Sequence, residues 1–425
     1  MDRAAAAAYR KVTWRLLPFL MLCYVVAYLD RVNVGFARLQ MLSDLGFSET
    51  VYGLGAGMFF IGYFTFEVPS NIILHRIGAR TWIARIMITW GIVSALFMFI
   101  KTPLSFYALR FVLGVAEAGF FPGIILYLTY WFPSDRRGRM ISLFMMAIPL
   151  SGIFGGPVSG WIMTTFAGKA GLAGWQWLFL LEAAPALVVG AIVLLYLDNG
   201  IRSAKWLNDE EKTLLERRLA EDSAHIQPHG SLRAVLADRR VVLMCAIYFT
   251  IVMGQYGLTF WMPTLIQAAG VSGTLKIGMF TAIPYGAGAI AMVFFGRSAD
   301  RRRERRWHAA SAMLIGAAGL TSSAIAGTHT ALAILFLTIA ATGVFSCAPL
   351  FWSLPTAFLS GAAAAAGIAA INSIGNLAGF VSPYVVGWLK DLTHSTQAGM
   401  FAVSAVLVAG AAIILVFVPA RLVNR

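Results

Sequence analysis

Long apolar runs separated by short polar stretches recur along the whole chain. A helix needs about 20 mostly apolar residues to cross the hydrocarbon core of a bilayer, and it satisfies its own backbone hydrogen bonds there. Each run therefore predicts a spanning helix, and together they predict an all-α integral membrane protein. Twelve runs are present, near residues 16–36, 53–75, 81–100, 105–131, 138–166, 176–197, 241–266, 276–296, 307–326, 331–359, 364–389 and 398–419.

One long polar stretch, residues 198–240, interrupts this pattern with eight acidic and eight basic residues. It divides the chain into a six-helix bundle over 1–197 and a second six-helix bundle over 241–425. Within the stretch, Asn208 followed by Glu211 predicts the capped start of a short helix. The stretch is either a solvated connector or a segment whose leucines lie along the membrane surface.

Composition excludes a water-soluble fold. Only 12% of the 425 residues are charged, against about 25% in a soluble domain, and the mean hydropathy is +0.76. The three cysteines, Cys23, Cys245 and Cys347, lie inside predicted spans without paired spacing, so they predict packing residues rather than a disulfide or a zinc site. The six histidines lack ligand spacing, and no nucleophile–base pair is visible, so neither a cofactor, a metal nor an enzyme is expected.

The net charge of +14 reflects topology. Counted over alternate connecting segments, 26 Lys and Arg residues fall on one side and 5 on the other. The positive-inside rule then predicts that both termini lie on the cytoplasmic side of the membrane, which is expected to be a bacterial inner membrane. The same distribution argues against nucleic-acid binding. The first run has no small-residue cleavage site behind it, so it is expected to remain as a helix and not to be removed as a signal peptide.

Few charged residues lie inside the spans, where each costs at least about 2.5 kcal/mol on insertion scales and therefore needs a partner or a purpose. Those well inside the spans are Asp30, Arg31, Glu67, Arg110, Glu117 and Glu182. Arg110 and Glu117 are seven residues apart and share a helix face, so they are expected to line one cavity. Asp30 and Arg31 are offset by about 100°, so one can face that cavity while the other reaches a neighbouring helix. Purely structural ion pairs are the alternative.

The two halves echo each other at their first helices. Arg15 precedes Asp30 by fifteen residues, and Arg240 precedes Gln255 by the same interval. Gln255 and its neighbour Tyr256 thus stand where the first half has its Asp–Arg pair, and they are expected to contact substrate hydroxyls. Such internal repeats are typical of transporters.

Short basic turns occupy matching places in the two halves. They are LHRIGAR over 74–80 and GRSADRRRERR over 296–306. With them the chain resembles the major facilitator superfamily over its full length. The second turn keeps that superfamily's G-x-x-x-D-R pattern at Gly296, Asp300 and Arg301. The first turn departs from it, since Asn71 and His75 replace the glycine and the aspartate.

Four further segments resemble one branch of the superfamily, the anion:cation symporters. They are AYLDRVN (27–33), IGYFTFEVPSNIILHRIGAR (61–80), RFVLGVAEAGFFPG (110–123) and INSIGNLAGFVSP (371–383). The branch includes permeases for galactonate, hexuronates, tartrate and phthalate. The resemblance implies a major facilitator fold, with twelve transmembrane helices in two six-helix pseudo-repeats, that carries a small organic anion with protons.

The resemblance also implies roles for individual residues. Proton coupling is assigned to Asp30 and Glu117. Substrate contacts are assigned to Arg31, Tyr63, Arg110 and one of Asn372 and Asn376. The chemistry agrees, because the arginine fork holds a carboxylate by paired hydrogen bonds and a buried acid can change charge. Glu67 and Glu182 match packing signatures of the family, so a structural role is favoured for both.

These observations predict a symporter that imports a carboxylate, a sugar acid or an aromatic acid by alternating access, with protons and the lipid bilayer as its other partners. A monomer suffices for this fold. Trp261, Phe351 and Trp352 suit an aromatic substrate, whereas the Asn and Gln residues suit a polyhydroxylated one. The alternatives are an exchanger or uniporter of the same fold, and a sensor that binds without transporting.

Overall fold

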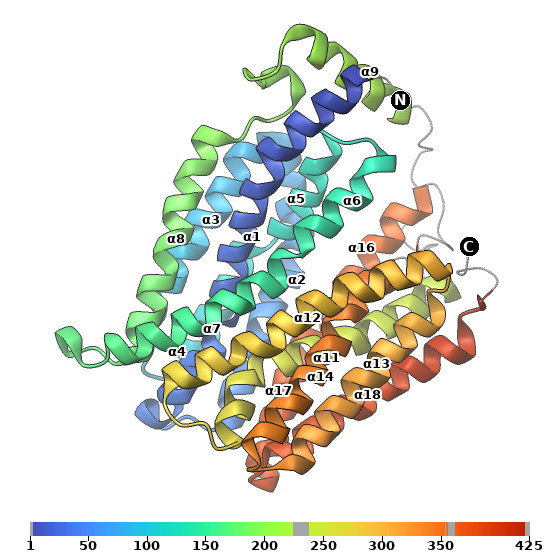
Figure 1. The fold of residues 1–425 in the computed structure, drawn as a ribbon. Helices are drawn as coiled ribbons and strands as arrows, with labels where there is room; N and C mark the ends of the chain where they lie inside the picture. The colour runs from blue at the N-terminus through green and yellow to red at the C-terminus, as the bar shows by residue number, and fades with distance from the viewer. Residues whose placement is uncertain (1–2, 224–237, 353, 356–361, 421–425) are drawn as a thin grey trace.

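The computed structural model describes residues 3–223, 238–352, 354–355 and 362–420, and the secondary structure in these ranges is helical, without strands (Figure 1). The first half contains α1 (Arg3–Leu45), α2 (Glu49–Ile77), α3 (Ala79–Leu96), α4 (Pro103–Glu117), α5 (Phe120–Thr129), α6 (Ser134–Met145), α7 (Ala147–Thr165) and α8 (Gly174–Tyr196). The second half contains α11 (Arg239–Ala268), α12 (Thr274–Arg302), α13 (Arg306–Ala326), α14 (Thr330–Trp352), α16 (Ala362–Asn376), α17 (Ala378–Thr393) and α18 (Thr396–Phe417).

Eleven helical stretches in the described ranges are long and apolar enough to cross a membrane. They match eleven of the twelve predicted spans. The predicted span over 364–389 consists of two shorter helices, α16 and α17, which meet at Leu377. The predicted span over 331–359 extends into residues outside the described ranges.

The fourth span is broken between α4 and α5, directly after Glu117. Gly119 has φ +84°, a left-handed backbone conformation that favours glycine. A Cβ atom on Gly119 would also lie 2.3 Å from Ser70 Oγ of α2. Both facts explain a glycine here, and the break leaves Glu117 at the end of a helix inside the bundle.

The connector between the halves contains the predicted capped helix, α9 (Asp209–Ser223). The Glu211 backbone N–H donates to Asn208 Oδ1 at 2.7 Å, and the Asn208 N–H donates to Glu211 Oε2 at 2.9 Å, which confirms the capping box. Lys11 Nζ lies 2.9 Å from Glu211 Oε2 and, by this hydrogen bond, lowers the pKa of that carboxyl. The contact ties α9 to the first turns of α1. Residues 224–237 of the predicted linker lie outside the described ranges.

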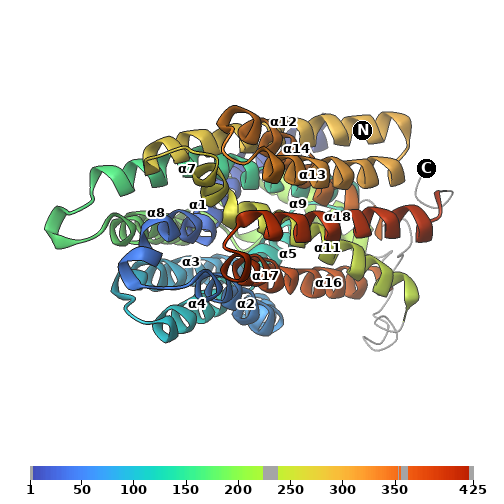
Figure 2. The same cartoon turned by 90° about the horizontal axis from the view of Figure 1, so that it is seen from below.

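The two halves meet along α2 with α17 and α7 with α12, and the views in Figures 1 and 2 show the helices of each half grouped together. A Cβ atom on Gly53 would lie 2.3 Å from the Pro383 carbonyl oxygen, and one on Gly156 would lie 2.7 Å from that of Gly278. Small residues let helix backbones approach this closely. The glycines therefore make a tight seam between the halves.

A cluster of charged residues strengthens the seam at the end of the bundle that carries the α1–α2 turn. We call it the interhalf cluster: Arg38, Glu49, Lys390 and Asp391. Arg38 Nε donates to Glu49 Oε2 at 2.9 Å, and Lys390 Nζ of the other half lies 2.7 Å from Glu49 Oε1. Asp391 accepts hydrogen bonds from the backbone N–H groups at the start of α2, at 3.1 and 2.7 Å. These contacts join the two halves at this end.

Candidate functional site

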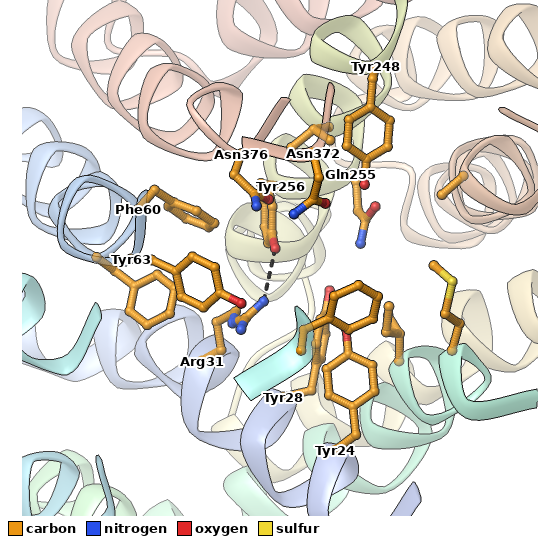
Figure 3. A pocket seen from close by; sticks show the side chains of 16 residues that line it. Tyr24, Tyr28, Arg31, Phe60, Tyr63, Tyr248, Gln255, Tyr256, Asn372 and Asn376 are labelled. Carbon is orange, nitrogen blue, oxygen red and sulfur yellow. Dashed lines mark hydrogen bonds between the residues drawn. The ribbon is translucent and has the colours of Figure 1, made fainter. Parts of the chain in front are cut away.

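A central cavity lies between the two halves and is lined from both of them (Figure 3). Its volume is about 50 Å³, space for a few water molecules. A bound organic molecule therefore requires some lining side chains to move. The side chains that line it are Tyr24, Tyr28, Arg31, Phe59, Phe60, Tyr63, Phe121, Met145, Ile148, Tyr248, Val252, Gln255, Tyr256, Ala348, Asn372 and Asn376.

Arg31 occupies the middle of this cavity and is only 6% exposed. Its Nη1 donates to Tyr256 Oη of the opposite half at 3.2 Å, and its Nη2 forms an ion pair with Glu117 Oε1. The guanidinium carbon lies 5.5 Å from the ring centre of Tyr63. The guanidinium of Arg31 thus joins a carboxylate of the first half to a hydroxyl of the second half. These contacts lie in a site that is largely screened from water.

Asp30, the neighbour of Arg31, points away from the cavity toward α3. Its carboxylate accepts from Trp90 Nε1 and from Ser94 Oγ, each at 2.9 Å, and it is 2% exposed. The helical offset between adjacent residues explains why one faces the cavity and the other a neighbouring helix. The two predicted proton-coupling acids therefore lie in different surroundings. Glu117 forms an ion pair with an arginine, whereas Asp30 accepts hydrogen bonds from neutral donors.

Arg110 is fully buried but does not line the cavity, contrary to the expectation from its spacing with Glu117. Its Nε and Nη2 donate to the backbone carbonyls of Gly55 and Ala56 on α2, at 3.3 and 3.0 Å. Its Nη1 has no hydrogen-bond partner among the described residues. The physical reason is the close approach of α4 to α2, which brings the side chain to the α2 backbone before it reaches the cavity.

Glu67 connects the two halves through a hydrogen bond with a residue that lines the cavity. Asn372 Nδ2, a cavity-lining amide of α16, donates to Glu67 Oε1 at 3.1 Å, and Ser373 Oγ lies 3.5 Å from Oε2. The packing role expected for Glu67 therefore includes a contact across the seam. Glu182 instead stays within the first half, where Ser159 Oγ donates to its Oε1 at 2.6 Å.

Most predicted site residues meet at the cavity. Those that line it are Arg31, Tyr63, Gln255, Tyr256, Asn372 and Asn376, and Glu117 reaches it through Arg31. The sequence reasoning missed Tyr24 and Tyr28, although their spacing of seven and three residues from Arg31 places them on the same face of α1. It also missed Tyr248, which lies seven residues before Gln255 on α11.

The aromatic residues expected to suit a substrate are not in the lining. Trp261 packs beside Arg38 of the interhalf cluster, whose guanidinium carbon lies 4.9 Å from the ring centre. Phe351 and Trp352 pack against Tyr248, with ring centres 4.9 Å away in each case. Phe351 and Trp352 thus support the lining residue Tyr248, and the tyrosines of α1, α2 and α11 line the cavity.

Comparison with known proteins decides the family. The family model described as Major Facilitator Superfamily matches residues 20–383. The chain belongs to the Major Facilitator Superfamily. This membership makes it a multi-pass membrane transport protein and confirms the superfamily predicted from the basic turns.

Individual relatives within the superfamily cover almost the whole chain. A protein of Agrobacterium vitis named "Putative tartrate transporter" is 52% identical over 408 residues, which are 96% of this chain and 94% of the relative. A Pseudomonas putida protein named "Putative metabolite transport protein NicT" is 48% identical over 426 residues, 100% of this chain and 97% of the relative. The solved structure of a D-xylose-proton symporter aligns with a TM-score of 0.74 at 17% identity, covering 96% and 98% of the two chains. These proteins are transporters, and the relatives fit the anion:cation symporter branch.

Proposed function

We propose that this protein is a symporter that carries a small organic anion together with protons across a bacterial inner membrane. The observation that carries the proposal is the double engagement of Arg31, which holds Glu117 of its own half and Tyr256 of the other. The relatives named for tartrate support an organic anion as the substrate. The arrangement provides a cation that can bind a substrate carboxylate, Arg31, and a carboxylate that competes for that cation, Glu117.

In the proposed cycle, the substrate and a proton reach the cavity from outside. Protonation of Glu117 removes its negative charge and weakens its hold on Arg31. The substrate carboxylate then takes the freed side of the guanidinium fork, where charge-assisted hydrogen bonds are short and strong. Loading thus depends on a proton because two carboxylates compete for one arginine.

Release reverses the competition on the cytoplasmic side. When Glu117 loses its proton, it again pairs with Arg31 and displaces the substrate carboxylate. Tyr256 remains bound to the same guanidinium from the opposite half. A change in the charge of Glu117 therefore alters a contact between the two halves. Alternating access requires the halves to move relative to each other at such contacts.

Asp30 has a different part in this proposal. Its hydrogen bonds go to Trp90 and Ser94, so it does not compete directly for Arg31. We assign it a second proton site that acts through the packing of α1 against α3. Glu117 and Asp30 thus couple protons through separate contacts, the first electrostatic and the second through helix packing.

The proposed orientation places the interhalf cluster at the outer face and both termini in the cytoplasm, in agreement with the distribution of Lys and Arg. The cluster and the glycine seam then close the outer path to the cavity. In this arrangement a six-helix bundle over 1–197 and a second one over 241–425 are joined on the cytoplasmic side by the 198–240 connector. A reporter inserted into the 198–240 connector should give a cytoplasmic signal, and an extracytoplasmic signal would overturn the orientation.

Purified protein in liposomes tests the function. Uptake of a radiolabelled organic acid should rise when an inward proton gradient is imposed, and uptake indifferent to the gradient would refute proton coupling. Counterflow without a gradient separates the alternatives. An exchanger would show counterflow but no accumulation driven by protons, and a sensor would bind the acid and show neither.

A further inference from the structure

Among the described residues, the lining of the cavity carries one permanent positive charge. Arg31 is the one Lys or Arg among the sixteen lining residues that the structure describes, and its acidic partner is Glu117. With Glu117 ionised the pair is neutral, and with Glu117 protonated it carries a single net positive charge. The site thus offers charge compensation for one carboxylate.

We infer that the cavity selects a small monocarboxylate over a dicarboxylate of the same shape, an inference that rests on the proposed function. One carboxylate of a ligand receives the fork of Arg31. A second carboxylate would meet only neutral hydroxyl and amide groups. Burying a charge without an opposite charge is unfavourable, and neutral hydrogen bonds offset only part of the lost hydration.

Arg110 does not supply the second cation. Two arms of its guanidinium are bound to the carbonyls of Gly55 and Ala56, and its guanidinium carbon lies 5.2 Å from the ring centre of Phe59, a lining residue. To reach a ligand it would have to give up both backbone bonds. Those carbonyls would then be left without that donor inside a tightly packed pair of helices.

The opposite wall discourages a second negative charge. There Asn372 donates to Glu67, so a carboxylate already stands behind the amide that a ligand would touch. A second ligand carboxylate at this wall meets like charge whenever Glu67 is ionised. A hydroxyl group at the same position can instead exchange hydrogen bonds with Asn376, Gln255 or a tyrosine (Figure 3).

Two matched pairs of acids test this inference by isothermal titration of the purified full-length protein. L-Threonate has a hydroxymethyl group where L-tartrate has its second carboxylate, and benzoate lacks the second carboxylate of phthalate. At about pH 7 the carboxyl groups are essentially ionised. In each pair that binds, the Kd of the monocarboxylate should be at least about tenfold lower than that of the dicarboxylate. This corresponds to about 1.4 kcal/mol of binding free energy.

The possible outcomes separate this inference from the proposed function. Dicarboxylates that bind as tightly as their partners, or more tightly, would overturn the monocarboxylate preference and leave organic-anion transport intact. If neither pair binds and a broad panel of carboxylic acids also fails, both ideas fall.

A charge-adding variant checks the physical cause. Gln255→Lys puts a second cation on the wall supplied by α11, and it should shift the preference toward the dicarboxylate by at least about tenfold. Gln267→Lys makes the same substitution at an exposed position of that helix and should leave the preference unchanged. A folded Gln255→Lys protein with an unaltered preference would contradict the charge argument.

Discussion

Arg31 and Tyr256 are hydrogen-bonded across the two halves of the transporter, with 3.2 Å between Nη1 and Oη. The same guanidinium is paired with Glu117. A change in the charge of Glu117 in the first half therefore alters a contact with the second half through one residue, Arg31.

The first prediction concerns this hydroxyl. Tyr256→Phe retains the ring, which packs 4.5 Å from Phe60 and 5.6 Å from Phe260 between centres, but loses the contact with Arg31. Substrate exchange in liposomes should slow by about tenfold or more, since a hydrogen bond to a charged group contributes about 1.5 to 3 kcal/mol. Affinity should change less than rate, because the fork remains. Tyr24→Phe, which removes a lining hydroxyl within the first half, is the control, and equal slowing in both variants would contradict the account.

A pair of conservative substitutions separates the two buried arginines. Arg31→Lys keeps the charge but loses the fork, so anion affinity should fall about ten- to a hundredfold while the protein still folds. Arg110→Lys should instead lower the melting temperature, because it removes hydrogen bonds to the α2 backbone. Titration and thermal unfolding of both variants distinguish these effects. Loss of affinity in Arg110→Lys as large as in Arg31→Lys would place Arg110 in the site.

The positions of these arginines show what the sequence can and cannot predict. The offset between Asp30 and Arg31 follows from helix geometry alone, so their separation was predictable. The position of Arg110 was not, because it depends on the distance between two helices. A Cβ atom on Gly114 would lie 2.0 Å from the Phe59 carbonyl oxygen, and at this close approach Arg110 bonds to the α2 backbone.

The other differences have separate origins. Eleven spans were predictable from apolar length, whereas the apolar pattern does not mark the division of the remaining span at Leu377. The echo between the halves identified Gln255 and Tyr256 as lining residues. The hydrogen bond between Glu67 and Asn372 joins residues 305 positions apart, so the local sequence around either residue does not predict it.

Glu67 provides the third prediction. Glu67→Ala removes the acceptor that holds Asn372 in the cavity wall, so anion affinity should fall by about tenfold. Glu67→Gln retains an oxygen acceptor and should keep both affinity and proton-driven uptake near those of the parent. If the Gln variant bound the anion normally but lost uphill uptake, Glu67 would itself be a proton-coupling residue, and the positioning role would be wrong.

The interhalf cluster provides the fourth prediction. Glu49→Gln weakens the contacts with Arg38 and Lys390, which stabilise the state closed at that end. A cysteine placed at the lining position Val252 should then react several times faster with an impermeant thiol reagent added from outside.

Arg202→Gln is the control for this measurement, because it removes an exposed ion pair with Glu216, and such pairs contribute little. Unchanged labelling in Glu49→Gln would mean that the cluster does not hold the outer path closed.

The most direct test of the account compares uphill uptake with substrate exchange in Glu117→Gln liposomes. The amide imitates the protonated acid and cannot return a negative charge to Arg31, so the variant should bind the anion and exchange it. Accumulation driven by a proton gradient should be lost. Asp30→Asn, measured in parallel, should also lose accumulation, because it removes the second proton site. Full proton-driven accumulation by Glu117→Gln would contradict the competition of Glu117 and substrate for Arg31.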